Sequence, residues 1–523
     1  MLQSSFVRYF LIAAIVFSPA LFFHSRQVLL LYPAEIFLYI FILDMLENLS
    51  KKAFLIVNTI LISVTLLFTS YGIVTGMPVG YQVFASVFET NVNEAFEFAS
   101  SSFFFKIVFT YLFLFIVSIY LLLKKRDSDE RLHKRKEVLF VASLLFMIYP
   151  FHFYNKFDYY PENVINMFQT YIGTIHDRVE KYIANRYVFE GDRDEKKELN
   201  LILVIGEASR RYSYSLYGYK RETNPRLQKD KENMILFTDV YTVAPYTRVA
   251  VPSLLSTSSV EQFSRIYNYP TLIRIFNSLK IPTTVLSNQT INLDSDIFIS
   301  AIFKEASEKF FLQKLNNGYF DKILYDQQLL PELKKSMREN AIKNKFIIMH
   351  LMGSHYKYEN RYPKERRFFL SDAIIDHYDN SIRYTDFVLS IIKKMIRKSD
   401  SPYAVLYLSD HGEYLNEFND GIYGHGVKEI TYFELEIPFI LFYNDKFKQR
   451  YKKEIANMVK NRDKKISLDN VSHTVLGLWG IHPKSYDAES DLSSDKFRQK
   501  PRSVILHDMK VKNVENIKIR TGS

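Results

Sequence analysis

The stretch LILVIGE, Leu201–Glu207, indicates the fold of the larger part of this chain. Its first five residues form a continuous apolar run, which is typical of a strand covered on both faces in a parallel sheet with helices around it. Two later apolar runs, Phe346–Met349 and Ala404–Leu408, share this pattern. The sequence therefore predicts an α/β domain with a mainly parallel central sheet.

Polar residues with metal-binding side chains follow the three apolar runs. Gly206 and Glu207 follow the first run, His355 lies a few residues beyond the second, and Asp410 and His411 lie just after the third. Ligands of open α/β sheets gather beyond the carboxyl ends of the strands, so we expect these side chains at one edge. His425 lies between two glycines and could reach the same edge from a loop. Carboxylate and imidazole groups can bind zinc without any cysteine, so these residues are candidate zinc ligands.

Nearly all long uncharged apolar runs fall within the first 155 residues. A helix needs roughly 20 apolar residues to cross a bilayer. Five segments approach that length: Phe6–Phe23, Val28–Met45, Ala53–Val74, Phe103–Leu123 and Val138–Phe153. The sequence therefore predicts a transmembrane domain of five helices over residues 1–155. The first segment could instead be the apolar part of a signal peptide, but no clear small-residue cleavage pattern follows it.

Lysine and arginine are unevenly distributed among the predicted loops. The segments 51–52 and 124–136 are basic, whereas Met77–Ser102 has no Lys or Arg and contains three glutamates. Basic loops resist translocation, so the N-terminus and both basic loops are expected inside. Five crossings then place everything after about residue 156 on the far side of the membrane.

The segment 156–198 links the two predicted domains. It mixes aromatic and charged residues, which suits a segment at the lipid–water interface; an ordinary amphipathic linker is the alternative. It ends in the charged stretch Asp192–Glu198. We therefore expect three parts: a transmembrane domain over 1–155, an interfacial linker over 156–198 and the α/β domain over 199–523.

The composition excludes several classes of chemistry. The chain has no cysteine, which rules out disulfides, thiolate metal sites and cysteine nucleophiles. Its formal net charge of +11 would suit nucleic acid, anionic lipid or general solubility. Since the α/β domain is expected outside the cytoplasm, we expect no nucleic-acid partner and favour a surface that faces phosphate-rich lipids.

Several motifs in a fixed order resemble a known family. They read VIGEASR at Val204–Arg210, SLYGY at Ser215–Tyr219, ETNPR at Glu222–Arg226 and SDHGE at Ser409–Glu413. Together they resemble the phosphoethanolamine transferases of Gram-negative envelopes, which are sulfatase-like members of the alkaline-phosphatase superfamily. The resemblance spans nearly the whole chain, because that family also has five N-terminal helices before a periplasmic domain.

The resemblance implies a function and a location. It implies an enzyme of the bacterial inner membrane, with several membrane crossings and a periplasmic catalytic domain. That enzyme would transfer phosphoethanolamine from phosphatidylethanolamine to lipid A or to an inner-core sugar of lipopolysaccharide. The reading Pro245-Tyr246-Thr247 and the missing cysteines resemble the branch that modifies inner-core sugars more than the branch that modifies lipid A.

The resemblance also implies a nucleophile and a metal site. In the family a threonine between the first motif and the Asp-His pair is the nucleophile, and Thr247 matches it. A threonine hydroxyl needs activation, which direct coordination to zinc would supply by lowering its pKa. By resemblance, one zinc ion would be held by Glu207, Thr247, Asp410 and His411; a second zinc ion remains open.

Three further residues match substrate positions in that family. His355 and His425 match histidines that bind the substrate phosphate or a second metal ion, and His425 would act as general acid. Asn288 falls where relatives place a polar substrate-binding residue. We also expect Thr247 to cap a helix that begins at Arg248, so that the helix N-terminus favours the phosphorylated intermediate.

Two other functions remain open from the sequence. A lipid-linked glycerol-phosphate transferase or a phosphatase would keep the same metal ligands and differ in the head-group pocket. A catalytically inactive membrane scaffold would keep the fold without the reaction. A formylglycine sulfatase of the cysteine type is excluded, because the chain has no cysteine.

Overall fold

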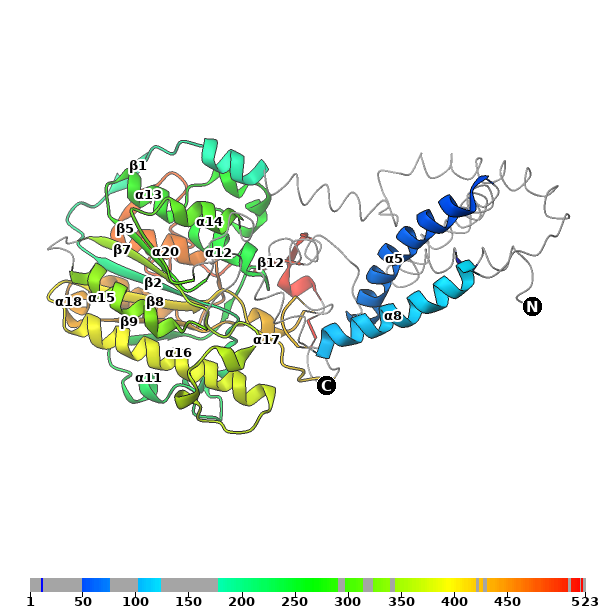
Figure 1. Cartoon of the computed structure of the whole chain (residues 1–523). Helices are drawn as coiled ribbons and strands as arrows, with labels where there is room; N and C mark the ends of the chain where they lie inside the picture. The colour runs from blue at the N-terminus through cyan, green and yellow to red at the C-terminus, as the bar shows by residue number, and fades with distance from the viewer. Residues whose placement is uncertain are drawn as a thin grey trace. The chain divides into compact units, whose positions relative to one another are not determined.

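The chain divides into two compact units, which Figure 1 shows in a computed structural model. One comprises Met1–Ala85 with Ala95–Ile172, and the other comprises Ser86–Glu94 with Gly173–Ser523. The described residues are 11–12, 49–75, 102–123, 177–289, 297–313, 323–338, 344–419, 423–426, 430–506, 509–517 and 519–520.

Two long apolar helices are described in the first unit. They are α5 (Lys51–Thr75) and α8 (Ser102–Leu123), and they pack against each other. Within α5, Phe54–Tyr71 is long and apolar enough to cross a membrane, and α8 contains the shorter apolar stretch Phe104–Tyr120. These helices coincide with the third and fourth predicted spans. The other three predicted spans lie almost wholly outside the described residues, so the number five stays a prediction.

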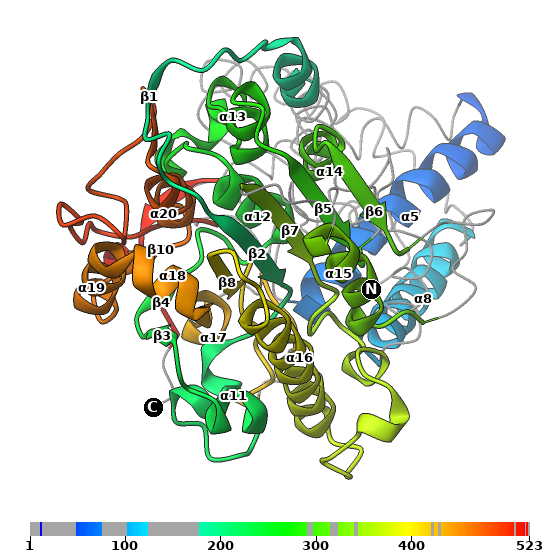
Figure 2. The ribbon, with the colours of Figure 1, turned by 90° about the vertical axis from the view of Figure 1, so that its left-hand side faces the viewer.

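A seven-stranded sheet forms the centre of the second unit (Figure 2). Its strand order is β3-β9-β8-β2-β7-β5-β6. The bounds are β2 Asn200–Gly206, β3 Met234–Phe237, β5 Thr283–Ser287, β6 Glu308–Phe311, β7 Lys345–His350, β8 Tyr403–Ser409 and β9 Phe439–Tyr443. The three apolar runs of the sequence are β2, β7 and β8, which pair in parallel. The sheet is mixed, because β9 runs antiparallel to both β3 and β8.

Helices cover both faces of this sheet, as Figures 1 and 2 show. Along β2, Leu201, Leu203 and Ile205 belong to one hydrophobic core, while Ile202 and Val204 belong to another. Helices of the first core are α12 Thr247–Leu255, α13 Leu272–Ser278, α14 Ile297–Lys304, α18 Asp445–Arg450, α19 Lys452–Asn461 and α20 Asn470–Trp479. Those of the second are α11 Pro225–Lys229, α15 Leu330–Arg338 and α16 Ile374–Arg397. Because successive side chains of a strand point to opposite faces, a strand buried on both faces reads as an unbroken apolar run.

The segment before β2 packs onto the second unit from Asp177 onward. The Tyr182 side chain is fully buried, and its hydroxyl donates to Glu305 Oε2 at 2.7 Å. The Arg274 guanidinium lies 3.5 Å from the centre of the Tyr182 ring. Further on, β1 (Gly191–Arg193) pairs antiparallel with β11 (Ile481–Pro483). The domain limits at residues 155 and 198 remain predictions.

Smaller elements complete the second unit. Strand β4 (Val240–Tyr241) pairs in parallel with β10 (Ile466–Ser467), and β12 (Ser503–Ile505) pairs antiparallel with β13 (Val511–Asn513). Tyr241 of β4, Val504 of β12 and Leu435 of the short helix α17 (Tyr432–Leu435) belong to a separate small apolar cluster.

Candidate functional site

The carboxyl ends of two neighbouring strands bring the predicted acidic residues together. Glu207 follows β2 and Asp410 follows β8. These strands are in register to their last residues, and the Asp410 backbone N–H donates to the Gly206 carbonyl at 3.1 Å. The parallel pairing therefore places both carboxylates at one edge, as the sequence predicts.

The four predicted zinc ligands lie within reach of one another. Thr247 Oγ1 is 3.1 Å from Glu207 Oε2 and 3.3 Å from His411 Nε2. His411 Nε2 is 3.2 Å from Glu207 Oε1 and 3.5 Å from Asp410 Oδ2. In Glu207, Asp410 and His411, one potential ligand atom of each lies within 4.8 Å of those of the other two. These three side chains are buried, so they form a compact group shielded from water.

The polar atoms of this group fit a divalent cation. Asp410 Oδ1 accepts from the His411 backbone N–H at 2.7 Å, whereas Asp410 Oδ2 is buried and forms no hydrogen bond. A buried carboxylate oxygen that accepts no hydrogen bond is costly, and so are two carboxylates side by side. Oxygen and nitrogen donors at this spacing suit zinc. A bound zinc ion would contact the free carboxylate oxygen and neutralise the repulsion between the two carboxylates.

The protonation equilibria of the group are strongly linked. Burial, followed by the charge of Glu207, raises the pKa of Asp410 to about 7. Burial opposes protonation of His411, but Asp410 and Glu207 together raise its pKa to about 10. Burial also opposes ionisation of Glu207, yet its hydrogen bond with His411 keeps its pKa below the usual value. The imidazolium of His411 therefore balances the two carboxylates.

A strained turn holds the acidic residue at the end of β2. Ala208 adopts the left-handed conformation, with φ of 51°, and its N–H donates to Asp410 Oδ1 at 3.2 Å. Across from it, Gly353 also has a positive φ, and an added Cβ would lie 2.7 Å from the Glu207 nitrogen. Only glycine allows this close approach between the two backbones. Strain at such positions is typical of functional sites.

The nucleophile candidate lies at the start of α12 rather than before it. The helix begins at Thr247, its N-cap residue is Tyr246, and no side chain caps it. The prediction that Thr247 caps a helix from Arg248 is therefore wrong, because the Thr247 hydroxyl interacts with Glu207 and His411 instead. The helix continues through Pro252 to Leu255. Its N-terminal end still lies at the hydroxyl, where it favours negative charge.

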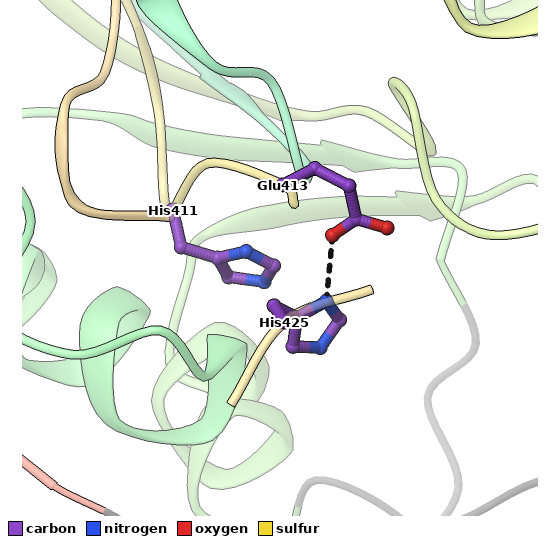
Figure 3. A group of neighbouring side chains, drawn as sticks. All are labelled: His411, Glu413 and His425. Carbon is purple, nitrogen blue, oxygen red and sulfur yellow. Dashed lines mark hydrogen bonds and ion pairs between the residues drawn. The ribbon is translucent and has the colours of Figure 1, made fainter. Parts of the chain in front are cut away.

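A buried carboxylate orients the predicted general acid (Figure 3). His425 Nδ1 is 2.9 Å from Glu413 Oε2, and the Tyr358 hydroxyl donates to Glu413 Oε1 at 2.6 Å. The rings of His425 and His411 lie 4.1 Å apart between centroids. Burial, and then the charge of His411, lowers the pKa of His425. Glu413 belongs to the SDHGE motif, but its contact with His425 is not predictable from that motif.

His355 lies on the loop after β7. Its Nδ1 is 3.0 Å from the Tyr356 carbonyl, and its own carbonyl accepts from Arg361 Nε at 3.0 Å. Its charge helps to lower the pKa of Glu207. Among the described residues it belongs to neither group of potential metal ligands, so its binding of phosphate or metal stays a prediction.

Two adjacent residues after β5 have different surroundings. The buried Asn288 amide donates to Asp326 Oδ1 at 2.8 Å and accepts from Gln313 Nε2 at 3.2 Å. The next side chain, Gln289, donates to Glu207 Oε2 at 3.0 Å and to the Leu351 carbonyl at 2.9 Å. Substrate binding by Asn288 stays a prediction. Gln289 contacts the site directly, although it was not predicted as a site residue. Its position just beyond the end of a strand is the one feature of the sequence that could have indicated this.

Comparisons with known families match both parts of the chain. The family described as Sulfatase matches residues 199–481. The family described as Phosphoethanolamine transferase EptA/EptB matches residues 35–163.

Two curated relatives show the extent of the sequence similarity. The putative transferase YhbX of Escherichia coli K12 is 30% identical over 46% of this chain, and the matched part spans 43% of that relative. The phosphoethanolamine transferase EptC of the same strain is 25% identical over 86% of this chain and 83% of its own length.

Solved structures share the fold. The integral membrane lipooligosaccharide phosphoethanolamine transferase A of Neisseria meningitidis is 19% identical, with a TM-score of 0.65 over 94% of this chain and 96% of that chain. The periplasmic domain of E. coli EptC, crystallised in complex with Zn, is 24% identical, with a TM-score of 0.57 over 63% of this chain and 96% of that domain.

Proposed function

We propose a function for this chain from its membership of the sulfatase family and, within it, of the phosphoethanolamine transferases. The chain would transfer phosphoethanolamine from a phospholipid to lipopolysaccharide through a covalent intermediate on Thr247. One observation carries the proposal: the Thr247 hydroxyl oxygen lies within 3.3 Å of both Glu207 and His411. A hydroxyl placed among buried metal-ligand groups is typical of an activated nucleophile.

The proposed donor is phosphatidylethanolamine, and the acceptor is lipid A or an inner-core sugar of lipopolysaccharide. The names of the relatives support this choice, since E. coli EptC is a phosphoethanolamine transferase and the Neisseria protein acts on lipooligosaccharide. The proposed location is the inner membrane, with five helices crossing it and the catalytic domain in the periplasm. An anchored enzyme meets a lipid donor at high local concentration.

Zinc is the proposed cofactor. Glu207, Asp410, His411 and Thr247 would hold one ion, which when bound would lower the pKa of the threonine hydroxyl. The buried Asp410 Oδ2, which accepts no hydrogen bond, supports this, as does the zinc complex of the EptC domain. A second ion is an open alternative, because His411, Glu413 and His425 form another compact group of potential ligands.

The reaction would proceed in two steps. First, the deprotonated Thr247 oxygen attacks phosphorus, the bond to the glycerol oxygen breaks, and His425 protonates the departing diacylglycerol. The N-terminus of α12 stabilises the phosphoethanolamine-threonine that results. In the second step an acceptor, either a lipid A phosphate or a sugar hydroxyl, attacks the same phosphorus, gives any proton it carries to His425 and releases Thr247. Glu413 would hold His425 in one orientation throughout, and His355 would bind a phosphate oxygen.

The covalent intermediate provides the test. The purified full chain is incubated with head-group-labelled phosphatidylethanolamine, and we expect diacylglycerol release and a phosphoethanolamine adduct on the Thr247 peptide. Thr247→Ala abolishes both, whereas Thr238→Ala, at an exposed threonine bonded to Asp463, changes neither. Absence of both products with the zinc-loaded wild-type chain would overturn the proposal.

Donor profiling separates the related functions. A glycerol-phosphate transferase would label Thr247 from a phosphatidylglycerol donor, and a phosphatase would transfer the group only to water. An inactive scaffold predicts that Thr247→Ala leaves the cellular phenotype intact, whereas the proposed transferase predicts that the lipopolysaccharide of the cell loses its phosphoethanolamine.

A further inference from the structure

A buried carboxylate joins three segments of the second unit that lie far apart in the sequence. Asp326 is the first residue of the short 3₁₀ helix η5 (Asp326–Leu329) and is 3% exposed. Its Oδ1 accepts from the Asn288 amide and from the Met352 backbone N–H, both at 2.8 Å. Its Oδ2 accepts from the Gly353 backbone N–H at 3.0 Å. Asp326 therefore connects η5 to the residues that follow β5 and β7.

The three donors around Asp326 select a charged acceptor. An ionised carboxylate accepts hydrogen bonds at both oxygens and donates none. An asparagine of the same shape would turn its NH₂ group toward at least one of the donors, and a buried donor left without an acceptor is costly. Burial raises the pKa of Asp326, whereas its bonds with Asn288, Met352 and Gly353 oppose that rise. The arrangement is thus built for a carboxylate at this position.

The turn that this carboxylate holds packs against Glu207. Gly353 approaches so closely that an added Cβ would lie 2.7 Å from the Glu207 nitrogen and 2.8 Å from its carbonyl oxygen. The Ser354 N–H donates to that carbonyl at 2.9 Å, and the His355 N–H donates to the Met352 carbonyl at 3.1 Å. The position of the turn therefore affects Glu207 on one side and His355 on the other.

The third donor connects Asp326 to a second support of Glu207. Asn288 donates to Asp326, and the next residue, Gln289, donates to Glu207 Oε2 at 3.0 Å. Glu207 is thus contacted by Gln289 at its side chain and by the turn after β7 at its backbone. Both contacts lie within one residue of a group that Asp326 holds.

We propose that Asp326 is a positioning residue of the metal site, which holds the ends of β5 and β7 so that the Glu207 carboxylate stays beside His411. It would act through backbone and amide groups rather than by touching the ion. This inference rests on the proposed zinc site, but it does not rest on the transfer reaction, because metal affinity is measured without turnover.

A second buried aspartate provides a matched control. Asp386 on α16 is fully buried, and its two oxygens accept from the successive backbone N–H groups of Arg226 and Leu227, each at 3.0 Å. These N–H groups belong to α11, which contains no predicted site residue. Asp386→Asn therefore disturbs the same kind of bonds without disturbing the support of Glu207.

The zinc affinity of the full chain tests the proposal. Each variant is purified in detergent, its folded fraction is isolated by size exclusion, and the metal-free chain is titrated with zinc against a chromophoric chelator. We expect Asp326→Asn to weaken zinc affinity by about tenfold, as for other residues that orient a metal ligand without binding the ion. Asp386→Asn should bind zinc as the wild type does.

Hydrogen exchange gives a second measurement that needs no metal. In the metal-free chains, the peptide that contains Met352 and Gly353 should exchange its amide hydrogens about tenfold faster in Asp326→Asn than in the wild type, because two of its N–H groups lose a charged acceptor. The same peptide in Asp386→Asn should exchange at the wild-type rate. Unchanged exchange in Asp326→Asn overturns the proposal.

The affinities decide the remaining alternatives. Equal zinc affinity in Asp326→Asn and the wild type overturns the proposal, and so does an equal loss in Asp326→Asn and Asp386→Asn, which a general loss of stability would cause. If Asp326→Asn yields no folded chain, Asp326→Glu is judged by the same criteria, since it keeps the charge but lengthens the side chain by one methylene. A wild-type chain that binds no zinc overturns the proposed zinc site and this inference with it. A zinc-binding wild type that transfers no head group overturns the proposed reaction alone, and a tenfold loss of affinity in Asp326→Asn then still supports positioning.

Discussion

A single amide on Gln289 contacts the site that the motifs define. It bonds the Leu351 carbonyl and Glu207 Oε2, which the Thr247 hydroxyl also contacts at 3.1 Å, while Glu207 Oε1 faces His411. Residues that orient a metal ligand in this way affect binding without touching the ion. Glu413 orients His425 in the same way, through the contact between its Oε2 and His425 Nδ1.

Removal of this amide should weaken metal binding. We expect Gln289→Ala to lower zinc affinity by about 10- to 100-fold, which a competition titration against a chromophoric chelator measures. Gln262→Ala, at an exposed position of the same unit, is the control and should bind zinc as the wild type does. Unchanged affinity in Gln289→Ala would show that Glu207 is oriented without it.

At the scale of elements, the site depends on how closely two strand ends approach. β2 and β7 pair in parallel, and the turn after β7 brings Gly353 against Glu207. The Ser354 N–H then donates to the Glu207 carbonyl at 2.9 Å. A side chain at position 353 would push these turns apart and move the carboxylate from its partners.

Two glycine substitutions distinguish the cost of a positive φ from the cost of steric overlap between the two turns. Gly353→Ala adds a positive-φ cost of about 1 kcal/mol and an overlap cost of about 1–3 kcal/mol. Gly218→Ala has a similar φ cost, with nothing within 4 Å of the added Cβ. We expect a larger loss of unfolding free energy for Gly353→Ala, together with weakened zinc binding, in denaturation and zinc titrations. If both variants lost the same unfolding free energy and both still bound zinc normally, the close contact between Gly353 and Glu207 would not be needed for the site.

At the scale of the whole molecule, the buried site couples metal binding to stability. The carboxylates of Glu207 and Asp410, each exposed by 1% or less, lie side by side in the interior of the second unit. A ligand that binds only the folded state stabilises it by about 2.7 kcal/mol at 100 times its dissociation constant. A metal ion bound at this site would therefore stabilise the folded unit as well as supply its chemistry.

Removal of the metal should make stability depend on pH. In the folded, metal-free chain the pKa of Asp410 is raised to about 7, whereas the unfolded residue titrates near 3.8. Folding then binds a proton between these values, so the contribution of Asp410 to stability falls as pH rises from about 4 to 7. We expect chelation to lower the melting temperature by more at pH 7.5 than at pH 5, and added zinc to restore it.

The variant Asp410→Asn provides the control for this effect. Without metal it should melt higher than the metal-free wild type at pH 7.5, since the charge beside Glu207 is gone, and added zinc should stabilise it less. Two results would contradict the coupling of metal binding to stability. One is a wild-type melting temperature that chelation does not change. The other is a metal-free Asp410→Asn chain that melts lower than the metal-free wild type.

Much of the fold was readable from sequence because burial on both faces leaves a simple pattern. Leu201–Ile205, Phe346–Met349 and Ala404–Leu408 are β2, β7 and β8, and parallel pairing of such strands places their carboxyl ends together. Glu207, Asp410 and His411 follow from those ends and from their motifs. These features depend on neighbours in the chain, which sequence patterns record.

Only the tertiary structure decided the rest, because it depends on contacts between distant segments. The reversal of β9 makes the sheet mixed, and no local pattern marks the direction of a buried strand. Gln289 rather than Asn288 contacts Glu207, since the turn after β5 directs successive side chains to different partners. Glu413 holds His425 across twelve residues. Each outcome was set by the packing of separate elements, which the order of residues along one segment does not specify.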